Sequence, residues 1–88
     1  MSYKIEFTEQ AQIDIAQHKK SGNKAVLTKI LTFLDELTEH PFKGTGKPEQ
    51  LKYDFSGYWS RRINKEHRLI YSISQDIVYI NSAFEHYL

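Results

Sequence analysis

Cysteine is absent from this chain of 88 residues. Without thiols, neither a disulfide framework nor a thiolate metal site is available. Long apolar runs are also missing, since none reaches the roughly 18 residues needed to cross a bilayer. The first residues, MSYKIEF, lack the character of a signal peptide, so a cytoplasmic protein is expected. The length suits one globular domain over residues 1–88, and no internal repeat or low-complexity segment divides it.

Excess charge is also scarce, because the net charge is only +1. Its distribution is uneven, however. Residues 1–40 carry five Lys against six acidic residues, whereas residues 43–68 carry seven basic against three acidic residues, a local excess of four. Charge of one sign focuses the field on an anionic ligand. The charge distribution alone is equally compatible with a solvated sheet edge that is protected by Lys and Arg.

The first half of the chain predicts a strand followed by two helices. Residues 3–7 alternate as a strand, and Thr8 offers an N-cap for a helix that runs to about Lys19. A second, amphipathic helix begins near residue 23 and is stopped by Pro41. Its expected apolar stripe consists of Leu27, Ile30, Leu31, Leu34 and Leu37.

The second half predicts four strands, near residues 49–55, 58–64, 67–74 and 77–84. Their connections are short, so neighbouring strands should form antiparallel hairpins. The two helices then have one sheet face to cover. We therefore expect an α+β fold, in which a strand and two helices precede a four-strand meander and both helices pack on one face of a twisted sheet.

The hairpin registers decide which face the arginines occupy. If the loops 64–66 and 74–76 each contain three residues, all odd-numbered strand residues face the helices together. These residues are Trp59, Ile63, Leu69, Tyr71, Ile73, Ile77, Tyr79 and Ala83. Arg62 and Arg68 then lie opposite one another on the other face. The alternative register sends one of them into the core, where an unpaired guanidinium is costly.

The same alternation places Lys52 beside the two arginines, and His86 as well if the last strand stays extended. Glu49 is the exception. Three apolar residues of its strand favour the core, and alternation takes Glu49 with them unless it swings out of the pleat after Pro48. Those apolar residues are Leu51, Tyr53 and Phe55.

A surface with two Arg, a Lys, a Glu and a His suits cleavage of an RNA phosphodiester. The 2′-hydroxyl must lose a proton, charge accumulates on the phosphate oxygens, and the departing 5′-oxygen needs a proton. Carboxylate and imidazole groups transfer protons, while fixed cations stabilise the charge without a metal or cofactor. Tyr58, Phe84 and Tyr87 are candidates for stacking on unpaired bases, although aromatic strand residues more commonly belong to a core.

Other motifs carry less weight. The loop GTGKPE lacks the spacing of a phosphate-binding P-loop, and no helix follows it. The pairs Glu66-His67 and Glu85-His86 lack the spacing of a metal site. His18 and His40 are interpreted as surface or helix-end residues.

Residues 41–73, followed by the terminal HY, resemble the YoeB/Txe-type toxins of the RelE superfamily. The blocks GKPEQLK, SGYWSRRI, EHRLIY and HY are jointly specific, and the resemblance covers nearly the whole chain. It implies a microbial RNase fold and a ribosome-dependent endoribonuclease that cuts messenger RNA in the decoding site. It also implies an antitoxin of the YefM/Phd type that covers the active face, and a homodimer or a toxin-antitoxin hetero-oligomer.

The resemblance also implies a role for each matching residue. Glu49 resembles the general base for the 2′-hydroxyl, Arg68 the group that stabilises the transition-state phosphate, and His86 the general acid. Supporting positions that bind and orient RNA are matched by Lys52, Arg62 and Tyr87. The resemblance therefore favours an outward-facing Glu49, which periodicity did not establish.

Two functions other than cleavage use the same basic face. A non-catalytic module that binds RNA or the ribosome would block translation by occupancy, and a regulatory subunit would mainly grip an acidic peptide of its antitoxin.

Leu88 extends the chain beyond the tyrosine at which the family commonly ends. If the terminal carboxylate of the family helps to position the histidine, this extra residue displaces that carboxylate.

Overall fold

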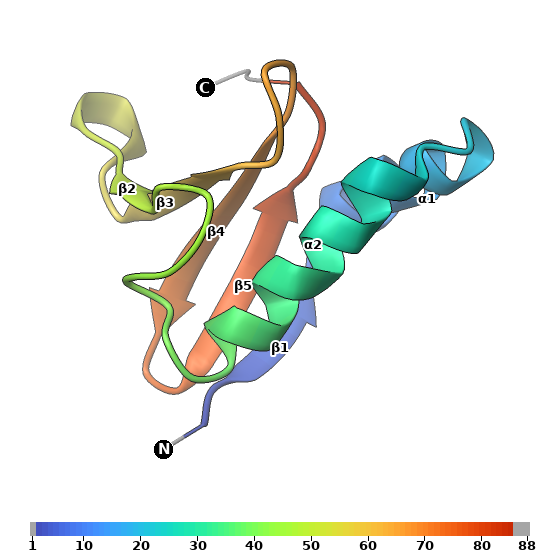
Figure 1. Cartoon of the computed structure of the whole chain (residues 1–88). Helices are drawn as coiled ribbons and strands as arrows, with labels where there is room; N and C mark the ends of the chain where they lie inside the picture. Colours follow the sequence, from blue (N-terminus) through green and yellow to red (C-terminus); the bar gives the residue numbers. More distant parts are fainter. Residues whose placement is uncertain (1, 86–88) are drawn as a thin grey trace.

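The computed structural model of the protein describes residues 2–85. Figure 1 shows two helices lying on the same side of a twisted sheet. No helix in that part of the chain combines the length and the apolar character needed to traverse a membrane. The elements in chain order are β1 (Lys4–Phe7), α1 (Glu9–Lys20), α2 (Lys24–Leu37), β2 (Glu49–Gln50), a 3-10 turn (Tyr53–Phe55), β3 (Tyr58–Arg62), β4 (Arg68–Ser74) and β5 (Ile77–Ser82).

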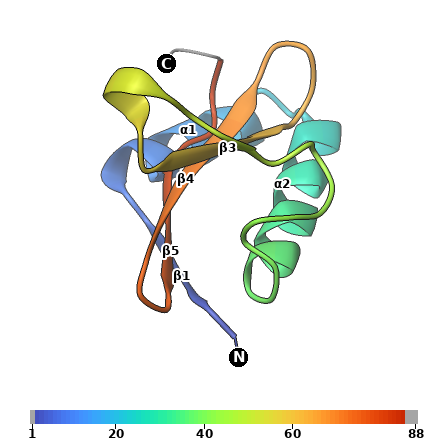
Figure 2. The same cartoon turned by 90° about the vertical axis from the view of Figure 1, so that its left-hand side faces the viewer.

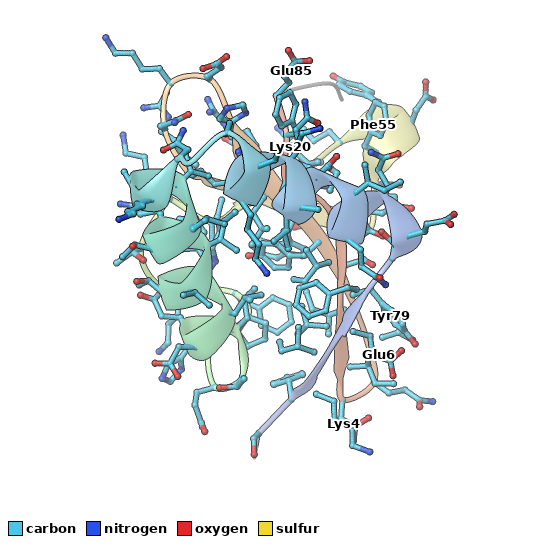
Figure 3. The ribbon with its side chains drawn as sticks, turned by 90° about the vertical axis from the view of Figure 1, so that its right-hand side faces the viewer. Lys4, Glu6, Lys20, Phe55, Tyr79 and Glu85 are labelled. Carbon is cyan, nitrogen blue, oxygen red and sulfur yellow. The ribbon has the colours of Figure 1, made fainter. Side chains whose placement is uncertain are left out.

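The sheet has five strands in the order β1-β5-β4-β3-β2. Strands β2 to β5 form the expected antiparallel meander, and β1 adds a parallel strand beside β5, with Lys4 opposite Ile77. Figure 3 shows Lys4, Glu6 and Tyr79 along this edge. The predicted α+β architecture, with both helices over one sheet face, is confirmed.

Side-chain caps begin both helices. The Thr8 hydroxyl accepts a hydrogen bond from the Ala11 N–H, which confirms the predicted cap, and Asn23 does the same for Val26. Helix α2 ends at Leu37, ahead of Pro41. After it, the chain returns across the front of the helix to reach the sheet beside β3 (Figure 2).

The stripe of α2 that enters the core is rotated from the predicted one. Its buried members are Val26, Ile30, Phe33 and Leu37. Leu31, expected in the core, is 66% exposed. Apolar residues occupy most of the circumference of α2, so periodicity alone did not decide which of them face the sheet. Some of the remaining ones line an apolar groove with residues from β1 and α1, and the groove includes Phe7, Ile15, Leu27, Leu31 and Leu34.

The two hairpins of the meander differ in register. Arg62 pairs with Arg68, as the three-residue loop predicts. Ser74, by contrast, pairs with Ile77, so the next turn contains two residues rather than three. Gln75 in this turn has φ 57°, which tight two-residue hairpin turns require at their first central position.

The shorter turn reverses the facing of most of β5. Val78 and Ile80 are fully buried against the helices, whereas Ile77 and Tyr79, predicted to face them, point to the other side. The register then shifts, because Tyr71 pairs with Ile80. Ile70 pairs with Ser82, which leaves Asn81 as the extra residue of a β-bulge. The bulge restores the predicted burial of Ala83.

The predicted strand at 49–55 is wrong beyond Gln50. Tyr53 has φ 59°, which is incompatible with an extended strand, and the chain forms a turn there instead. Tyr53 is 91% exposed and Phe55 is 38% exposed, so neither residue joins the core, contrary to the prediction.

Candidate functional site

A small pocket opens where β2, β3 and β4 lie side by side. Its volume is about 140 Å³, and its lining residues are Lys47, Glu49, Ser60, Arg62 and Arg68. Sites for drug-sized ligands are larger, roughly 300–1,000 Å³. Three cationic side chains around so small a space suit one anionic group, such as a single phosphate.

Strand pairing explains why these residues meet. Arg62 lies directly opposite Arg68, and Ser60, two residues before Arg62, lies opposite Glu49. Residues opposite one another share a sheet face, and so do residues two apart along a strand. Two like charges facing each other repel, so a bound anion relieves this repulsion.

Glu49 lies on the arginine face, and its side chain is exposed. Alternation turns Glu49 toward the core only if β2 continues to residue 55. Because β2 ends at Gln50, the apolar residues after it do not determine which way Glu49 points.

The guanidinium of Arg68 is held by the neighbouring hairpin loop. Its Nη1 donates to the backbone oxygens of Asn64 at 2.8 Å and His67 at 3.2 Å. The Asn64 side-chain oxygen in turn accepts the N–H groups of Glu66 and His67. The loop is therefore braced by Asn64, and Arg68 is oriented before any ligand arrives.

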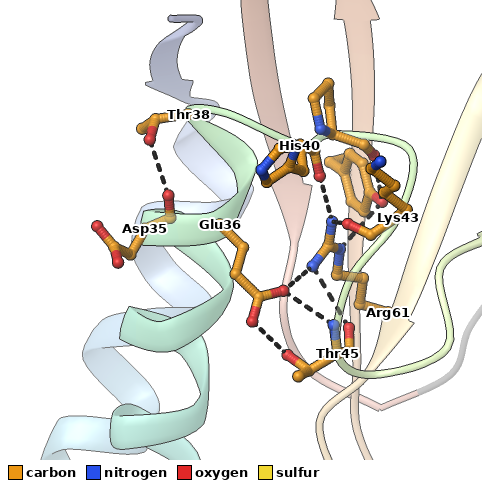
Figure 4. Close-up of polar contacts among 9 residues, drawn as sticks. Asp35, Glu36, Thr38, His40, Lys43, Thr45 and Arg61 are labelled. Carbon is orange, nitrogen blue, oxygen red and sulfur yellow. Dashed lines mark hydrogen bonds and ion pairs between the residues drawn. The ribbon is translucent and has the colours of Figure 1, made fainter.

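Arg61, next to Arg62 in β3, points into the core and is fully buried. Figure 4 shows its guanidinium enclosed by the chain that follows α2. Nη1 forms an ion pair of 2.7 Å with Glu36. The other contacts are with the backbone oxygens of His40 (2.8 Å), Lys43 (2.9 Å) and Thr45 (3.3 Å) and with the hydroxyl of Tyr71 (3.2 Å).

Further contacts close the loop over Arg61. Glu36 accepts both the N–H and the hydroxyl of Thr45, and the Tyr71 hydroxyl donates to the Pro41 oxygen at 2.9 Å. Burial raises the pKa of the Tyr71 hydroxyl, against a smaller lowering effect of Arg61, which keeps this donor protonated.

Glycine lets the same loop approach the ion pair. A Cβ on Gly44 would collide with the Glu36 carboxylate, so a side chain does not fit there. The Gly46 oxygen then accepts the Arg62 N–H at 2.7 Å. The loop is thus joined to β3 directly before Lys47 and Glu49, and Arg61 supports the pocket from the core side.

Acid should weaken this network. Burial alone would raise the pKa of the Glu36 carboxyl, but hydrogen bonds from Thr45 and Arg61 and the Arg61 charge lower it below its usual value of 4.5. A lowered pKa in the folded state stabilises the fold above the unfolded pKa, and this stabilisation is lost as the pH falls through the folded pKa. We expect the free energy of unfolding of Glu36→Gln to fall less than that of wild type between neutral pH and about pH 3. Urea titrations at several pH values measure this, with exposed Glu39→Gln as the control. The prediction would be contradicted if the free energy of unfolding fell by the same amount in wild type and in Glu36→Gln between neutral pH and about pH 3.

The predicted site residues fall into three groups. Glu49, Arg62 and Arg68 line one pocket. Lys52 is exposed and lies beyond the end of β2, so strand alternation does not place it there, and it is not among the pocket-lining residues. His86 and Tyr87 lie outside the described residues.

Sequence reasoning missed three residues of the site. Alternation places Ser60 on the arginine face but does not indicate that it lines a pocket. Lys47 belongs to the basic segment, but the loop that carries it lacks the spacing of a P-loop and therefore gives no sequence signal for a pocket residue. Arg61 has an odd number, so the alternation that places its neighbours in the core also predicts its burial. Glu36 on α2 supplies the partner that makes this burial tolerable.

Comparison with known proteins identifies relatives of this chain. Residues 7–87 match the family model of the YoeB-like toxin of bacterial type II toxin-antitoxin systems. Toxin YoeB of Synechocystis sp. is 45% identical over 85 residues, which cover 96% of each chain. A YoeB dimer from Staphylococcus aureus superposes with a TM-score of 0.86 at 36% identity, covering 99% of this chain and 100% of that one. The YoeB-YefM complex from the same organism gives a TM-score of 0.85 at 38% identity, with the same coverage.

Proposed function

Because the chain belongs to the YoeB-like toxins of bacterial type II toxin-antitoxin systems, we propose that it is a ribosome-dependent endoribonuclease that cuts messenger RNA in the decoding site. The observation that carries this proposal is the direct pairing of Arg62 with Arg68, with Glu49 in the same pocket. This arrangement offers a phosphate two guanidinium groups and places a carboxylate close to them.

The proposed reaction needs no metal ion. Glu49 removes the proton of the 2′-hydroxyl, whose oxygen forms a bond to the adjacent phosphorus. Arg68 and Arg62 stabilise the charge that develops on the non-bridging oxygens. His86 donates a proton to the 5′-oxygen as its bond to phosphorus breaks. The products are a 2′,3′-cyclic phosphate and a free 5′-hydroxyl.

Additional side chains bind and orient the RNA in this proposal. Lys52 contacts the phosphate backbone outside the pocket, and Tyr87 stacks on a base. Lys47 adds a third cation at the pocket itself. Such contacts position the scissile phosphate, and this positioning supplies a large part of the rate enhancement when no covalent intermediate forms.

Purified protein incubated with programmed ribosomes tests the proposal. We expect new message ends within the codon in the decoding site, mapped at nucleotide resolution. An intact message together with blocked translation would replace cleavage by the occupancy alternative, in which the basic face only binds RNA and affinity falls steeply with salt. An intact message with unimpaired translation would reject both and favour a subunit that mainly grips its antitoxin.

We also propose that the protein acts in the cytoplasm and is restrained by an antitoxin of the YefM/Phd type. The solved Staphylococcus aureus relatives form a YoeB dimer and a YoeB-YefM complex. Their similarity over nearly the full length supports a homodimer or a toxin-antitoxin hetero-oligomer for this chain as well.

Replacing Arg68 by alanine should weaken both RNA binding and cleavage. The guanidinium meets phosphate in the ground state and in the transition state, so its loss affects both. We expect kcat/KM on programmed ribosomes to fall roughly 10²-fold. Lys4→Ala is the control, because it removes one positive charge from β1 at the opposite edge of the sheet. A loss confined to binding, with an unchanged rate at saturation, would contradict the role of Arg68 in the transition state.

A further inference from the structure

Buried polar side chains surround the backbone of residues 83–85, just after β5. Asp14, His18 and His67 are only 3%, 1% and 4% exposed. His18 lies in the last turn of α1, so its place at a helix end is confirmed, whereas the surface alternative is wrong because the side chain is buried. The proposed reaction gives none of these three residues a task.

Helix α1 satisfies both backbone groups of Ala83. Asp14 Oδ2 accepts the Ala83 N–H at 2.9 Å, and His18 Nε2 lies 2.8 Å from the Ala83 oxygen. Because a carbonyl only accepts, His18 Nε2 carries the proton and donates. Asp14 and His18 are four residues apart and share one helix face. The helix thus replaces a neighbouring strand at the point where β5 has ended.

His67 holds the peptide that follows. The Glu85 N–H donates to His67 Nδ1 at 2.8 Å, so this nitrogen is the acceptor. The Arg68 N–H donates to the Glu85 oxygen at 3.2 Å. Glu85 has φ 59°, a left-handed conformation that is unfavourable for a residue other than glycine. The surrounding hydrogen bonds maintain it.

Aromatic contacts complete the enclosure. The ring of Phe84, a candidate for stacking on bases, lies 5.1 Å from that of His18 and 4.7 Å from that of His67. The two imidazoles are 4.7 Å apart, edge to face. Figure 3 labels Glu85 at the end of the segment and Lys20 on α1. Each of the three consecutive residues 83–85 therefore has its own contacts with α1 or with the β3–β4 hairpin.

So many polar groups are unusual for a core position. Buried polar groups are costly unless they are hydrogen-bonded, and apolar side chains of similar volume often stabilise a core at least as well. Six polar or charged residues are buried within the described part of the chain, and three of them serve this one segment. What they add is one defined backbone position. That position matters because residue 86 follows Glu85 and because the backbone N–H of Arg68 donates to the Glu85 oxygen.

We propose that Asp14, His18 and His67 are positioning residues that fix residues 83–85 and thereby fix the point from which the chain continues to His86. The inference rests on the proposed function, because it assumes that His86 donates a proton to the leaving oxygen. The positioning residues themselves do not touch RNA. They set the starting point of the chain that carries the imidazole.

Two pairs of amide substitutions test this role. At position 18, glutamine keeps a donor near the place of Nε2, whereas asparagine is too short. At position 67, asparagine keeps an acceptor near the place of Nδ1, whereas glutamine does not. We expect His18→Asn and His67→Gln to lower the single-turnover cleavage rate roughly 10- to 100-fold, with little change in ribosome affinity. His18→Gln and His67→Asn should lose much less. Exposed His40→Gln is the matched control.

This crossed pattern separates positioning from general destabilisation. Side-chain size changes in opposite directions at the two positions, so a loss that follows melting temperature or volume alone would overturn the proposal. Hydrogen exchange gives a second readout. The Ala83 amide, whose acceptor is Asp14, should stay protected in His18→Gln, and the Glu85 amide, whose acceptor is His67, should lose protection in His67→Gln but not in His67→Asn.

The test remains decisive if wild type does not cut RNA. The imidazole resonances of His86 should then shift in His18→Asn and His67→Gln and stay close to wild type in the other two variants. Unchanged resonances would overturn the inference without reference to cleavage. If a core variant does not fold, Gln10→Leu replaces it, because exposed Gln10 donates to Asp14 Oδ1 at 2.8 Å. We expect this variant to lower Ala83 amide protection severalfold, and unchanged protection would count against the role of Asp14.

Discussion

Replacing Arg61 by methionine is expected to destabilise the fold by about 3–5 kcal/mol. The substitution keeps an unbranched side chain but leaves the Glu36 carboxylate and several backbone oxygens without their shared donor. Removing one partner of a buried ion pair is costly because the other partner stays desolvated. Urea denaturation at neutral pH measures the change in the free energy of unfolding.

The neighbouring arginine supplies a matched control. Arg62 is exposed on the opposite face of the same strand, so Arg62→Met should change stability by less than about 1 kcal/mol. A double-mutant cycle with Glu36→Gln adds a second criterion, because the loss in the double variant should be smaller than the sum of the single losses. Equal stability of Arg61→Met and Arg62→Met would disprove the structural role of Arg61.

Glu49→Gln is expected to slow cleavage on programmed ribosomes roughly 10³-fold, while ribosome binding stays nearly intact. The amide keeps the size of the side chain but accepts a proton far less readily than a carboxylate. Glu49 is exposed in a two-residue strand, so stability should change little. Single-turnover rates at saturating protein, together with a separate binding measurement, distinguish proton transfer from affinity.

Glu6→Gln makes the same chemical change on β1, at the other edge of the sheet, and should cut at the wild-type rate. A parallel loss of binding and cleavage in Glu49→Gln would show that Glu49 mainly positions the RNA. An unchanged cleavage rate would remove it from the reaction altogether.

Local pattern predicted much of this molecule. The order of elements follows from hydrophobic periodicity and from the caps, and the facing of Arg62 and Arg68 follows from one loop length. The facing of Val78 and Ile80 did not, because a turn of two residues and a turn of three both suit the sequence around Gln75. The bulge at Asn81 was equally hidden, since it depends on pairing with β4 rather than on any local signal.

The site shows the same division. The family resemblance indicated the orientation of Glu49, whereas alternation failed because it cannot detect that β2 stops at Gln50. The burial of Arg61 depends on tertiary partners that are distant in sequence, namely Glu36 and the loop after α2. A pattern restricted to one strand contains the parity of Arg61 but not these partners.

The adjacency of Arg61 and Arg62 has a consequence for how genes of this kind can change. A point mutation at either codon harms one property, either the integrity of the core or the grip on phosphate. Loss of a single codon within β3 would exchange the two environments and harm both at once. Lineages descending from this chain should therefore accumulate replacements at the other positions of β3 while keeping its length constant.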